Sequence, residues 1–398
     1  MLIIQIKKEV SMKKALSLIL TAVLIFSVIA SGGITAFAES EIIEDGDYDY
    51  ILLDDGTYEL AGYYGSDKDL VLPSEFRGKP VTVLGGQSCC MCDELVSVVI
   101  PNTVTVIGEQ CFKTCPVLES VTIPSSVKAI GSGAFSNCPN LSRVNIDDIA
   151  VWCETVFGDN EANPLYTAKD LYLNGSIVKD LVVPEGVEKV SDYAFFSASL
   201  ESVKFSPSVT EIGIGAFYQC ESLAEVSLSS GIKTIGRAAF TNCASLKELN
   251  IPYGVEEINE FAFNSCTSLK SITLPASVTS INSNALDGCS ALEELIVLSN
   301  ASFGFSGTGS SSLTVYAKAD SPAKAYAESN GIAFSPLTGG DADGDGEIDI
   351  SDLSMIMLYL SGEGELTNVQ AACADINEDS TVDGFDMFYV DKAMNGLA

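Results

Sequence analysis

The sequence predicts a repeat solenoid of short parallel strands and short helical turns, followed by a small all-α domain. The solenoid is indicated by a pattern that returns every 23 residues, marked by cysteine at positions 92, 115 and 138 and again at 220, 243, 266 and 289. A unit this short cannot bury its own apolar face, so neighbouring units must stack and share a core. The second domain is indicated by an acidic loop that occurs twice, beginning at Asp341 and Asp375, 375 − 341 = 34 residues apart.

Each repeat opens with the alternating stretch Leu-x-x-Val-x-Ile, which predicts a short strand. In one unit this stretch runs from Leu118 to Ile123, and Pro124 follows it. Proline cannot donate to a ladder, so it ends the strand. Ala-Phe then opens a helical turn, in which we expect Phe135 to fill the corner and Cys138 to lie beneath the next strand.

One repeat position alternates between glycine and asparagine, which predicts a backbone conformation with positive φ. Its residues are Gly108, Gly131, Gly213, Gly236, Asn259 and Asn282. The outward-facing strand positions are expected to be small and polar, with no aromatic ring. They include Glu119, Ser120, Thr122, Ser142, Arg143, Asn145, Glu201, Ser202, Lys204, Ala224, Glu225, Ser227, Lys247, Glu248, Asn250, Lys270, Ser271 and Thr273.

The predicted boundaries follow the breaks in this pattern. Residues 39–94 form an N-terminal cap and first repeat, 95–300 the solenoid, 301–337 a C-terminal cap, and 338–398 the all-α domain. The cap is expected to hold a final strand over 313–316 and a helix that begins at Ser321-Pro322 and ends near Asn330-Gly331. A divergent insert, 147–180, interrupts the repeats. Its Trp152, the single tryptophan, is expected to pack in the core rather than serve as a platform for a sugar ring.

The N-terminus predicts export. Lys13 and Lys14 precede an apolar stretch, and Ala36-Phe37-Ala38 is a typical cleavage site, so residues 1–38 are interpreted as a signal peptide. Met12 is an alternative start. The expected location is secreted and extracellular, with no membrane span after cleavage; a retained membrane anchor is the alternative. The regular cysteine spacing argues for buried thiols at equivalent positions rather than for paired disulfides.

Composition narrows the possible functions. Lysine and arginine number 21 and aspartate and glutamate 54, so the net charge is 21 − 54 = −33, and histidine is absent. Such a surface disfavours nucleic acid and anionic membranes as partners. The lack of histidine removes the Ser-His and Cys-His arrangements of nucleophilic catalysis. No unassigned stretch is long enough for a catalytic domain, so we expect no enzymatic activity. We also expect a monomer outside any larger complex.

The two acidic loops predict calcium sites. Oxygen-bearing residues occupy loop positions 1, 3, 5, 9 and 12, and position 7 supplies a backbone carbonyl, as calcium requires. The candidate ligands are Asp341, Asp343, Asp345, Glu347, Asp349 and Asp352 in the first loop, and Asp375, Asn377, Asp379, Thr381, Asp383 and Asp386 in the second. Ser380 replaces the glycine expected at position 6, so the second of the two sites should be weaker.

A helix is expected after each loop and none before it. The apolar positions Leu353, Ile356 and Leu360 in the first helix match Met387, Val390 and Met394 in the second. Because this domain can bury little surface, calcium should supply much of its folding free energy.

Two resemblances follow from these motifs. The Ile-Pro-x-x-Val-x-x-Ile-Gly-x-x-Ala-Phe-x-x-Cys repeat resembles the BspA-like leucine-rich repeats of exported bacterial proteins, which implies a non-catalytic scaffold. The duplicated loop-helix units with aspartate at position 12 resemble the type I dockerin. That resemblance implies calcium-dependent docking to a cohesin module of a scaffolding protein, in complexes that degrade plant cell walls. It also implies cohesin contacts at loop positions 10 and 11, here Ile350-Ser351 and Gly384-Phe385, and these pairs differ between the two halves.

Together these observations predict a secreted, non-catalytic component of a cellulosome-type complex. The solenoid would present a surface that binds protein or polysaccharide. Two alternatives remain at this stage: a glycoside hydrolase, because dockerins usually accompany such enzymes, and an adhesin that binds host or neighbouring cells.

Overall fold

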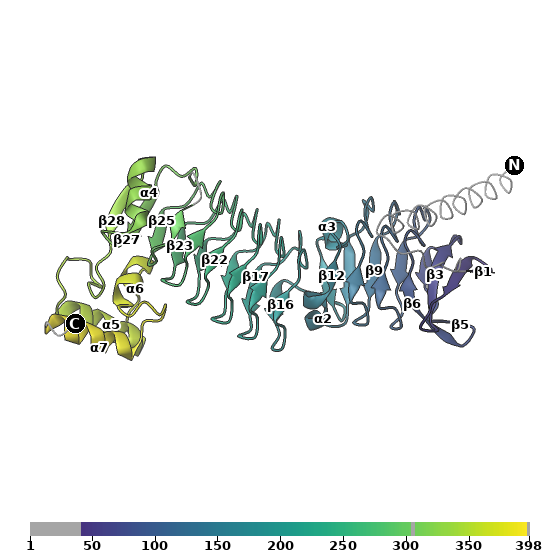
Figure 1. Ribbon diagram of the computed structural model, residues 1–398, viewed down its shortest axis with the longest axis horizontal. Coiled ribbons are helices and arrows are strands. Elements are labelled where there is room, and N and C mark those ends of the chain that lie inside the picture. Colours follow the sequence, from purple (N-terminus) through teal and green to yellow (C-terminus); the bar gives the residue numbers. More distant parts are fainter. Residues whose placement is uncertain (1–40, 304–306, 396–398) are drawn as a thin grey trace, which may run out of the picture. The chain divides into compact units, whose positions relative to one another are not determined.

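The computed structural model describes residues 41–303 and 307–395, and it divides into two compact units with the boundary between Val178 and Lys179 (Figure 1). The expected signal peptide, residues 1–38, lies outside the described residues. Both units contain parallel ladders of short strands, and the second unit also contains the C-terminal helices. The predicted solenoid with a small all-α end is confirmed.

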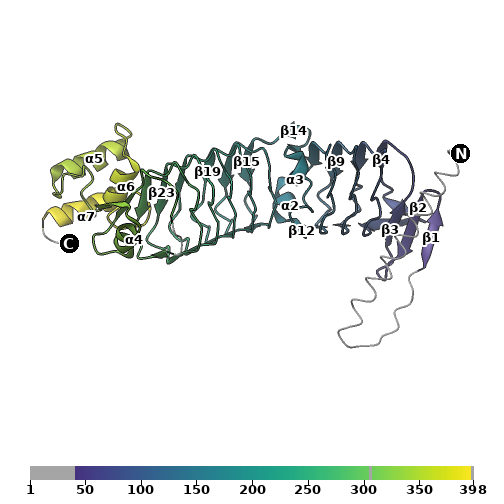
Figure 2. The same cartoon turned by 90° about the horizontal axis from the view of Figure 1, so that it is seen from above.

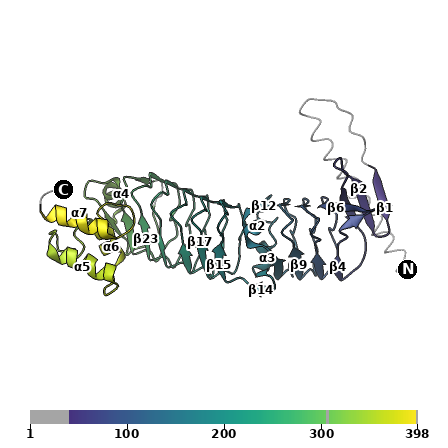
Figure 3. The same ribbon diagram turned by 90° about the horizontal axis from the view of Figure 1, so that it is seen from below.

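Two sheets form the first unit (Figures 2 and 3). One contains β1 (Ile42–Asp45), β2 (Tyr48–Leu52), β3 (Tyr58–Tyr63), β6 (Lys79–Leu84), β8 (Val106–Ile107), β10 (Ala129–Ile130) and β12 (Val156–Phe157), with β5 (Glu75–Phe76) paired to β6. The other contains β14 (Ser176–Ile177), β13 (Leu171–Leu173), β11 (Arg143–Ile146), β9 (Ser120–Ile123), β7 (Ser97–Val99) and β4 (Asp69–Val71).

Three sheets form the second unit. One contains β15 (Asp180–Val183), β17 (Ser202–Phe205) and β19 (Glu225–Ser227). Another contains β16 (Lys189–Val190), β18 (Glu211–Ile212), β20 (Thr234–Ile235), β22 (Glu257–Ile258), β24 (Ser280–Ile281) and β26 (Ser302–Phe303). The last contains β21 (Glu248–Asn250), β23 (Ser271–Leu274), β25 (Glu294–Val297), β27 (Thr314–Ala317) and β28 (Ala333–Pro336). The expected final strand is therefore followed by one more, β28.

The 23-residue period sets the strand register. Ser97 pairs with Ser120, and Ser120 pairs with Arg143, so equivalent residues of successive repeats lie side by side. Alternate side chains of a strand point to opposite faces, so one face is apolar and buried along the whole ladder. The exposed face is built from the remaining polar positions.

Stacked phenylalanine rings and cysteine thiols fill the corner of most repeats; Ala198 replaces the cysteine in one repeat and Leu286 the phenylalanine in another. The ring centroids of Phe217 and Phe240 are 5.2 Å apart, with an angle of 4° between their planes. The Cys243 thiol donates to the carbonyl oxygen of Phe217 at 3.3 Å, and Cys266 makes the same bond to Phe240 at 3.2 Å. All twelve cysteines are thiols. Those at the repeat positions, which we call the ladder cysteines, are buried: Cys92, Cys115, Cys138, Cys220, Cys243, Cys266 and Cys289. The thiol thus fills space and satisfies a carbonyl of the preceding repeat.

The expectation of positive φ at the glycine and asparagine position is wrong. The positive-φ residues lie two positions later, as Gln110 at 56° and Gly133 at 61° illustrate. The glycine is needed for close approach instead, because a Cβ on Gly131 would lie 2.6 Å from the backbone nitrogen of Glu109. At Asn282, in the same position, the side-chain amide donates to Glu257 Oε1 of the preceding repeat at 2.9 Å.

The insert is folded into the ladders. It forms α2 (Ile149–Glu154), β12, α3 (Leu165–Ala168), β13 and β14, and β12 and β13 pair with β10 and β11 of the preceding repeat. Trp152 is buried, with its ring centroid 5.2 Å from that of Phe157. The predicted core packing of Trp152 is confirmed, and the insert provides a complete, modified repeat.

The C-terminal cap contains the predicted helix, α4 (Pro322–Asn330), which ends at Gly331 with φ of 65°. The following segment contains α5 (Ile350–Ser361), α6 (Asn368–Ala374) and α7 (Gly384–Met394). The expectation that no helix precedes either loop is wrong for the second loop, because α6 ends immediately before Asp375.

The helix α6 packs against the last strands of the solenoid. Ala372 and Val369 join Ile296 and Leu298 in an apolar cluster, and Asn368 Nδ2 donates to Ser271 Oγ at 3.1 Å. Ser271, which we expected to be exposed, is consequently buried.

A separate small core holds α5 and α7 together. Ile356 and Val390 are buried at its centre, and Leu353, Met387 and Met394 pack against them. Leu360, expected in the same apolar stripe, is instead 41% exposed.

Candidate calcium centres and docking face

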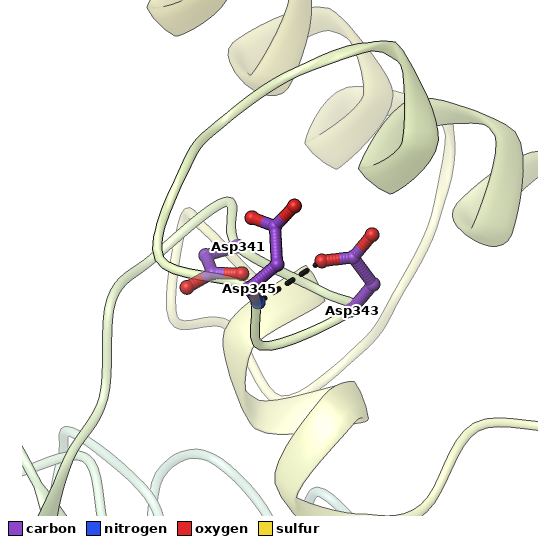
Figure 4. Close-up of side chains that lie close together, drawn as sticks. All are labelled: Asp341, Asp343 and Asp345. Carbon is purple, nitrogen blue, oxygen red and sulfur yellow. Dashed lines mark hydrogen bonds between the residues drawn. The ribbon is translucent and has the colours of Figure 1, made fainter.

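The first acidic loop brings three carboxylates together immediately before α5. Asp341, Asp343 and Asp345 each offer an oxygen, and these oxygens all lie within 4.8 Å of one another (Figure 4). Backbone amides hold the arrangement: Gly344 and Gly346 donate to Asp341 at 2.8 and 3.0 Å. The amide of Asp345 donates to Asp343 Oδ1 at 3.1 Å. The loop is therefore wrapped tightly around its own acidic groups.

The second loop has a similar hydrogen-bond pattern, with the donors to its first aspartate at positions 5 and 6 instead of 4 and 6. The amides of Asp379 and Ser380 donate to the two oxygens of Asp375 at 3.1 and 2.8 Å. Asn377 Nδ2 donates to Asp379 Oδ2 at 3.1 Å. Ser380 has φ of 69°, in the region that favours glycine. Positions 1, 3 and 5 thus converge here too, but with an amide in place of one carboxylate.

The aspartate at position 12 closes each loop from the first turn of the following helix. Asp352 accepts from the amides of Asp343 and Asp349 at 3.0 and 2.8 Å, and Asp386 accepts from the amide of Asp383 at 2.8 Å. Both position-12 side chains are fully buried. A buried carboxylate is costly unless a cation or donors compensate it. These two residues are therefore poised to complete a cation site.

The remaining candidate ligands are placed differently. Asp349 and Asp383 cap the helices, accepting from the amides of Ser351 and Phe385 at 2.7 Å each. Glu347 and Thr381 at position 7 are exposed, and in that position the backbone carbonyl is the group that calcium uses. The structure thus brings the side chains at loop positions 1, 3 and 5 together. The aspartate at position 12 is held beside them by hydrogen bonds from loop amides, and the aspartate at position 9 caps the following helix.

Burial perturbs the acids of the second loop. It raises the pKa of Asp375 to about 6, with the neighbouring Asp386 carboxylate adding to the effect. Burial also raises the pKa of Asp386. In the described part of the chain, Glu378 is the loop residue that forms an ion pair, and its partner is Lys318. Glu378 is not one of the candidate ligands. Among the residues that the structure describes, no lysine or arginine forms an ion pair with the candidate ligands. An all-oxygen donor set of this kind fits a hard cation such as calcium.

The helices that begin at the two loops carry exposed apolar side chains. On α7, Phe385 is 68% exposed and Phe388 54% exposed, with Tyr389 beside them. The corresponding side chains on α5 are Ile350, Met357, Leu358, Tyr359 and Leu360. We call these eight residues the docking face. Apolar groups left exposed on so small a domain indicate a protein-binding surface.

Sequence reasoning identified only part of this face. Ile350 and Phe385 were predicted, and Ser351 and Gly384 beside them are also exposed. The other six residues of the face were missed. Phe388 and Tyr389 are among them, although the three aromatic residues within the 11 residues of α7 exceed what its small core can bury. This surplus of aromatic residues in α7 was the sequence feature that could have predicted the rest of the face on that helix.

Comparison with protein families decides the classification. Residues 82–162 and 168–303 match the BspA type leucine rich repeat region in six copies. The chain belongs to the BspA-type leucine-rich repeat proteins. Residues 339–395 are a dockerin type I domain. Both resemblances inferred from the sequence are confirmed.

Solved structures of leucine-rich repeat proteins are similar to this BspA-type chain. A leucine rich cell surface protein from Faecalibacterium prausnitzii A2-165 is 25% identical, with 68% of this chain and 96% of that chain covered and a TM-score of 0.32. A leucine-rich repeat protein from Bacteroides ovatus ATCC 8483 is 25% identical, with 71% of each chain covered and a TM-score of 0.45. A search among curated proteins finds no match.

These families define the general character of the BspA-type chain. Leucine-rich repeats and dockerins are non-catalytic in kind, and both are typical of extracellular proteins. Type I dockerins bind calcium in general, and a dockerin implies a cohesin partner in a cellulosome-type complex. In the described ranges, 41–303 and 307–395, no helix has the length and apolar character needed to span a membrane.

Proposed function

We propose that this protein is a secreted, non-catalytic component of a cellulosome-type complex that acts on polysaccharides. Its dockerin, residues 338–398, docks to a cohesin on a scaffolding protein, while the solenoid presents a surface for a protein or carbohydrate ligand. The observation that carries this proposal is the docking face, whose two helices begin at the two acidic loops. The protein is otherwise a monomer.

Calcium links the loops to the docking face in this proposal. Asp341, Asp343, Asp345 and Asp352 would hold one ion, and Asp375, Asn377, Asp379 and Asp386 the other. When bound, the ion neutralises carboxylates that otherwise repel one another. The chain's own residues then fix the helices, because Asp352 and Asp386 belong to the first turns of α5 and α7. Loss of either carboxylate should release a helix that carries part of the docking face: five of its eight residues on α5, or three on α7.

The test is calcium-dependent capture of residues 39–398 by a panel of recombinant type I cohesins. Binding should occur in millimolar calcium and disappear in EDTA, and the double variant Asp341→Ala with Asp352→Ala should fail to bind. Phe385→Ala with Phe388→Ala should weaken cohesin binding while calcium binding, followed by calorimetry, persists. Tyr253→Ala, at a residue 51% exposed on the solenoid, is the matched control. Equal cohesin capture in EDTA and in calcium would refute the proposal.

The two alternative functions make different predictions. A glycoside hydrolase needs two carboxylates about 5–9.5 Å apart in a cleft. The hollow over β9 and β11 has one carboxylate in its lining, that of Asp147. Turnover of cellulose, xylan or pectin by the purified protein would establish the enzyme instead. An adhesin would bind host or bacterial cells through the solenoid even when the dockerin is deleted.

A further inference from the structure

The first unit contains a hollow of about 570 Å³ on the exposed face of its ladder, over β9 and β11. We call it the β9–β11 hollow, and its polar lining comprises Ser120, Thr122, Arg143, Asn145, Asp147 and Asn174. This volume is in the range of small-ligand sites. The geometry points to a binding site for a short saccharide that carries a carboxylate, that is, a uronic acid sugar. This inference rests on the proposed function, in which the solenoid presents a ligand-binding surface, and gives that ligand a chemical class.

Arg143 is the group that would recognise the carboxylate. Its guanidinium lies 3.9 Å from the centroid of the Tyr172 ring, and its Nε donates to Asn145 Oδ1 at 2.8 Å. Asn145 is oriented in turn, because its Nδ2 donates to the carbonyl of Val121 at 3.3 Å. Because Nε already donates to Asn145, the guanidinium edge that stays available to a ligand is the one formed by the two terminal nitrogens. That edge matches the two oxygens of a carboxylate.

This arrangement depends on the insert. Tyr172 lies on β13, in register with Asn145 of β11, so both side chains share the exposed face. The expectation of a face without aromatic rings holds for the regular repeats and fails at this strand. Asn174 follows in the same segment, and its backbone N–H donates to the carbonyl oxygen of Ile146 at 3.0 Å. The insert therefore supplies the ring that supports Arg143 and one wall of the hollow.

Arg143 differs from the other arginines of the chain. The sequence contains three, Arg77, Arg143 and Arg237. Each lies near an aromatic ring, but Arg237 also pairs with Glu260, with 3.7 Å between Nε and Oε2. Arg143 has no ion pair among the described residues, and it alone of the three lines the hollow. A chain with net charge −33 thus presents here a positive group that is held in place but not neutralised.

The rest of the lining favours a sugar over an acidic peptide. Hydroxyls and amides from Ser120, Thr122 and Asn174, with the Asp147 carboxylate as an acceptor, suit the hydroxyl groups of a sugar ring. Protein partners are commonly anchored by a large side chain in a well-packed pocket, whereas the apolar lining here is limited to Ile123, Pro124 and Ile146. The surrounding acidity also limits the length of the ligand, because a long polyanion would meet repulsion beyond Arg143. A terminal uronate of one to two sugar rings is the expected ligand.

Calorimetry with digalacturonate on residues 39–398 tests the inference. Saturable binding is expected, with at least a tenfold loss for Arg143→Met and for the methyl-esterified sugar. Arg143→Lys keeps the charge and loses the planar edge, so it should also lose most of the affinity. Arg237→Met is the matched control and should bind within twofold of the unchanged protein. Thermal melts and cohesin capture should be the same for all variants.

The outcomes separate this inference from the proposed function. No binding of digalacturonate, or unchanged binding by Arg143→Met, would overturn the site, whether or not cohesin capture succeeds. Binding retained by Arg143→Lys would overturn the recognition by the planar edge. Tighter binding of a triglutamate peptide than of digalacturonate would overturn the saccharide class. Failure of cohesin capture alone would instead count against the dockerin role.

Discussion

At the scale of single residues, the same amino acid type serves different physical ends. Gly131 is required because the neighbouring backbone approaches too closely for a Cβ, whereas Gly346 has φ of 92° in the first acidic loop. Ser380 occupies the equivalent position of the second loop with φ of 69°. A non-glycine residue in this region is strained by about 1 kcal/mol or more. Two of our predictions follow from these positions.

Ser380→Gly should strengthen the second calcium site. Relief of about 1 kcal/mol of backbone strain corresponds to about a fivefold gain in affinity. The reciprocal variant, Gly346→Ser, should weaken the first site by a similar factor. Calcium titration by calorimetry measures both. Two equally tight sites in the unaltered protein, or no gain on Ser380→Gly, would contradict the expected difference between the sites.

Gly131→Ala should destabilise the first unit by about 1–3 kcal/mol, because the new methyl group forces two backbone segments apart. Gly86→Ala is the matched control, since the nearest atom to its Cβ is a carbonyl oxygen at 3.5 Å, an ordinary contact. Chemical denaturation followed by the fluorescence of Trp152 reports on this unit. Equal stability of the two variants would show that close approach is not the reason for glycine at position 131.

At the scale of the repeat, a cysteine thiol links each turn to the one before it. The thiols of Cys243 and Cys266 are buried and donate to phenylalanine carbonyls of the preceding repeats. Burial raises the pKa of both thiols well above the ordinary value. The reactive thiolate form of these two cysteines is therefore suppressed, and both should be chemically inert in the folded protein.

Alkylation should reveal this difference between cysteines. At pH 8, iodoacetamide should modify Cys90 first, because it is the one cysteine of the twelve that is not buried. The ladder cysteines should react only after denaturant is added. Peptide mapping by mass spectrometry identifies the modified sites. Rapid modification of the ladder cysteines in the folded protein would contradict the prediction. So would an intact mass lower than that calculated for twelve reduced cysteines.

At the scale of the whole molecule, charge separates the dockerin from the rest. Residues 339–398 contain fourteen acidic residues and one lysine, a net charge of −14 + 1 = −13 within the total of −33. Asp341, Asp352, Asp375 and Asp386 are buried in the loops, and none of them forms an ion pair within residues 41–303 and 307–395. The fold of this domain therefore depends on whatever neutralises them, which is a proton at low pH and calcium at neutral pH.

The calcium-free dockerin should lose stability as pH rises. The pKa of Asp375 is raised to about 6 in the folded chain, against about 3.9 in an unfolded one. Between these values the folded state holds more protons, so stability is greatest below about pH 4 and is lost as pH rises through about 6. Calorimetry of the dockerin transition in EDTA from pH 4 to 7.5 measures this. Calcium should reverse this dependence of stability on pH, and Asp375→Asn should flatten it. Stability that increases with pH in EDTA would refute the prediction.

Much of this architecture could be read from the residues in order. The fixed spacing of Cys220, Cys243 and Cys266 predicted stacked turns, because identical local segments make identical contacts with their neighbours. The two acidic loops predicted cation sites, because every ligand position lies within twelve consecutive residues. The order of residues along the chain was sufficient to predict both the stacked turns and the cation sites.

Contacts between distant segments could not be read in this way. Ser271 is covered by Asn368, 97 residues later in the sequence. Tyr172 lies beneath Arg143 only because the insert returns to the ladder in register with Asn145. The reason for glycine at position 131 likewise depends on the backbone of another turn.

The repeat, the two acidic loops and both family resemblances could thus be recognised from consecutive residues alone. The folded chain was needed to show which glycines are required for close approach, which side chains are left exposed on the dockerin, and where the ladder gains an aromatic ring. This division arises because period and ligand spacing are properties of consecutive residues. Burial and close approach are properties of segments that the sequence separates and folding brings together.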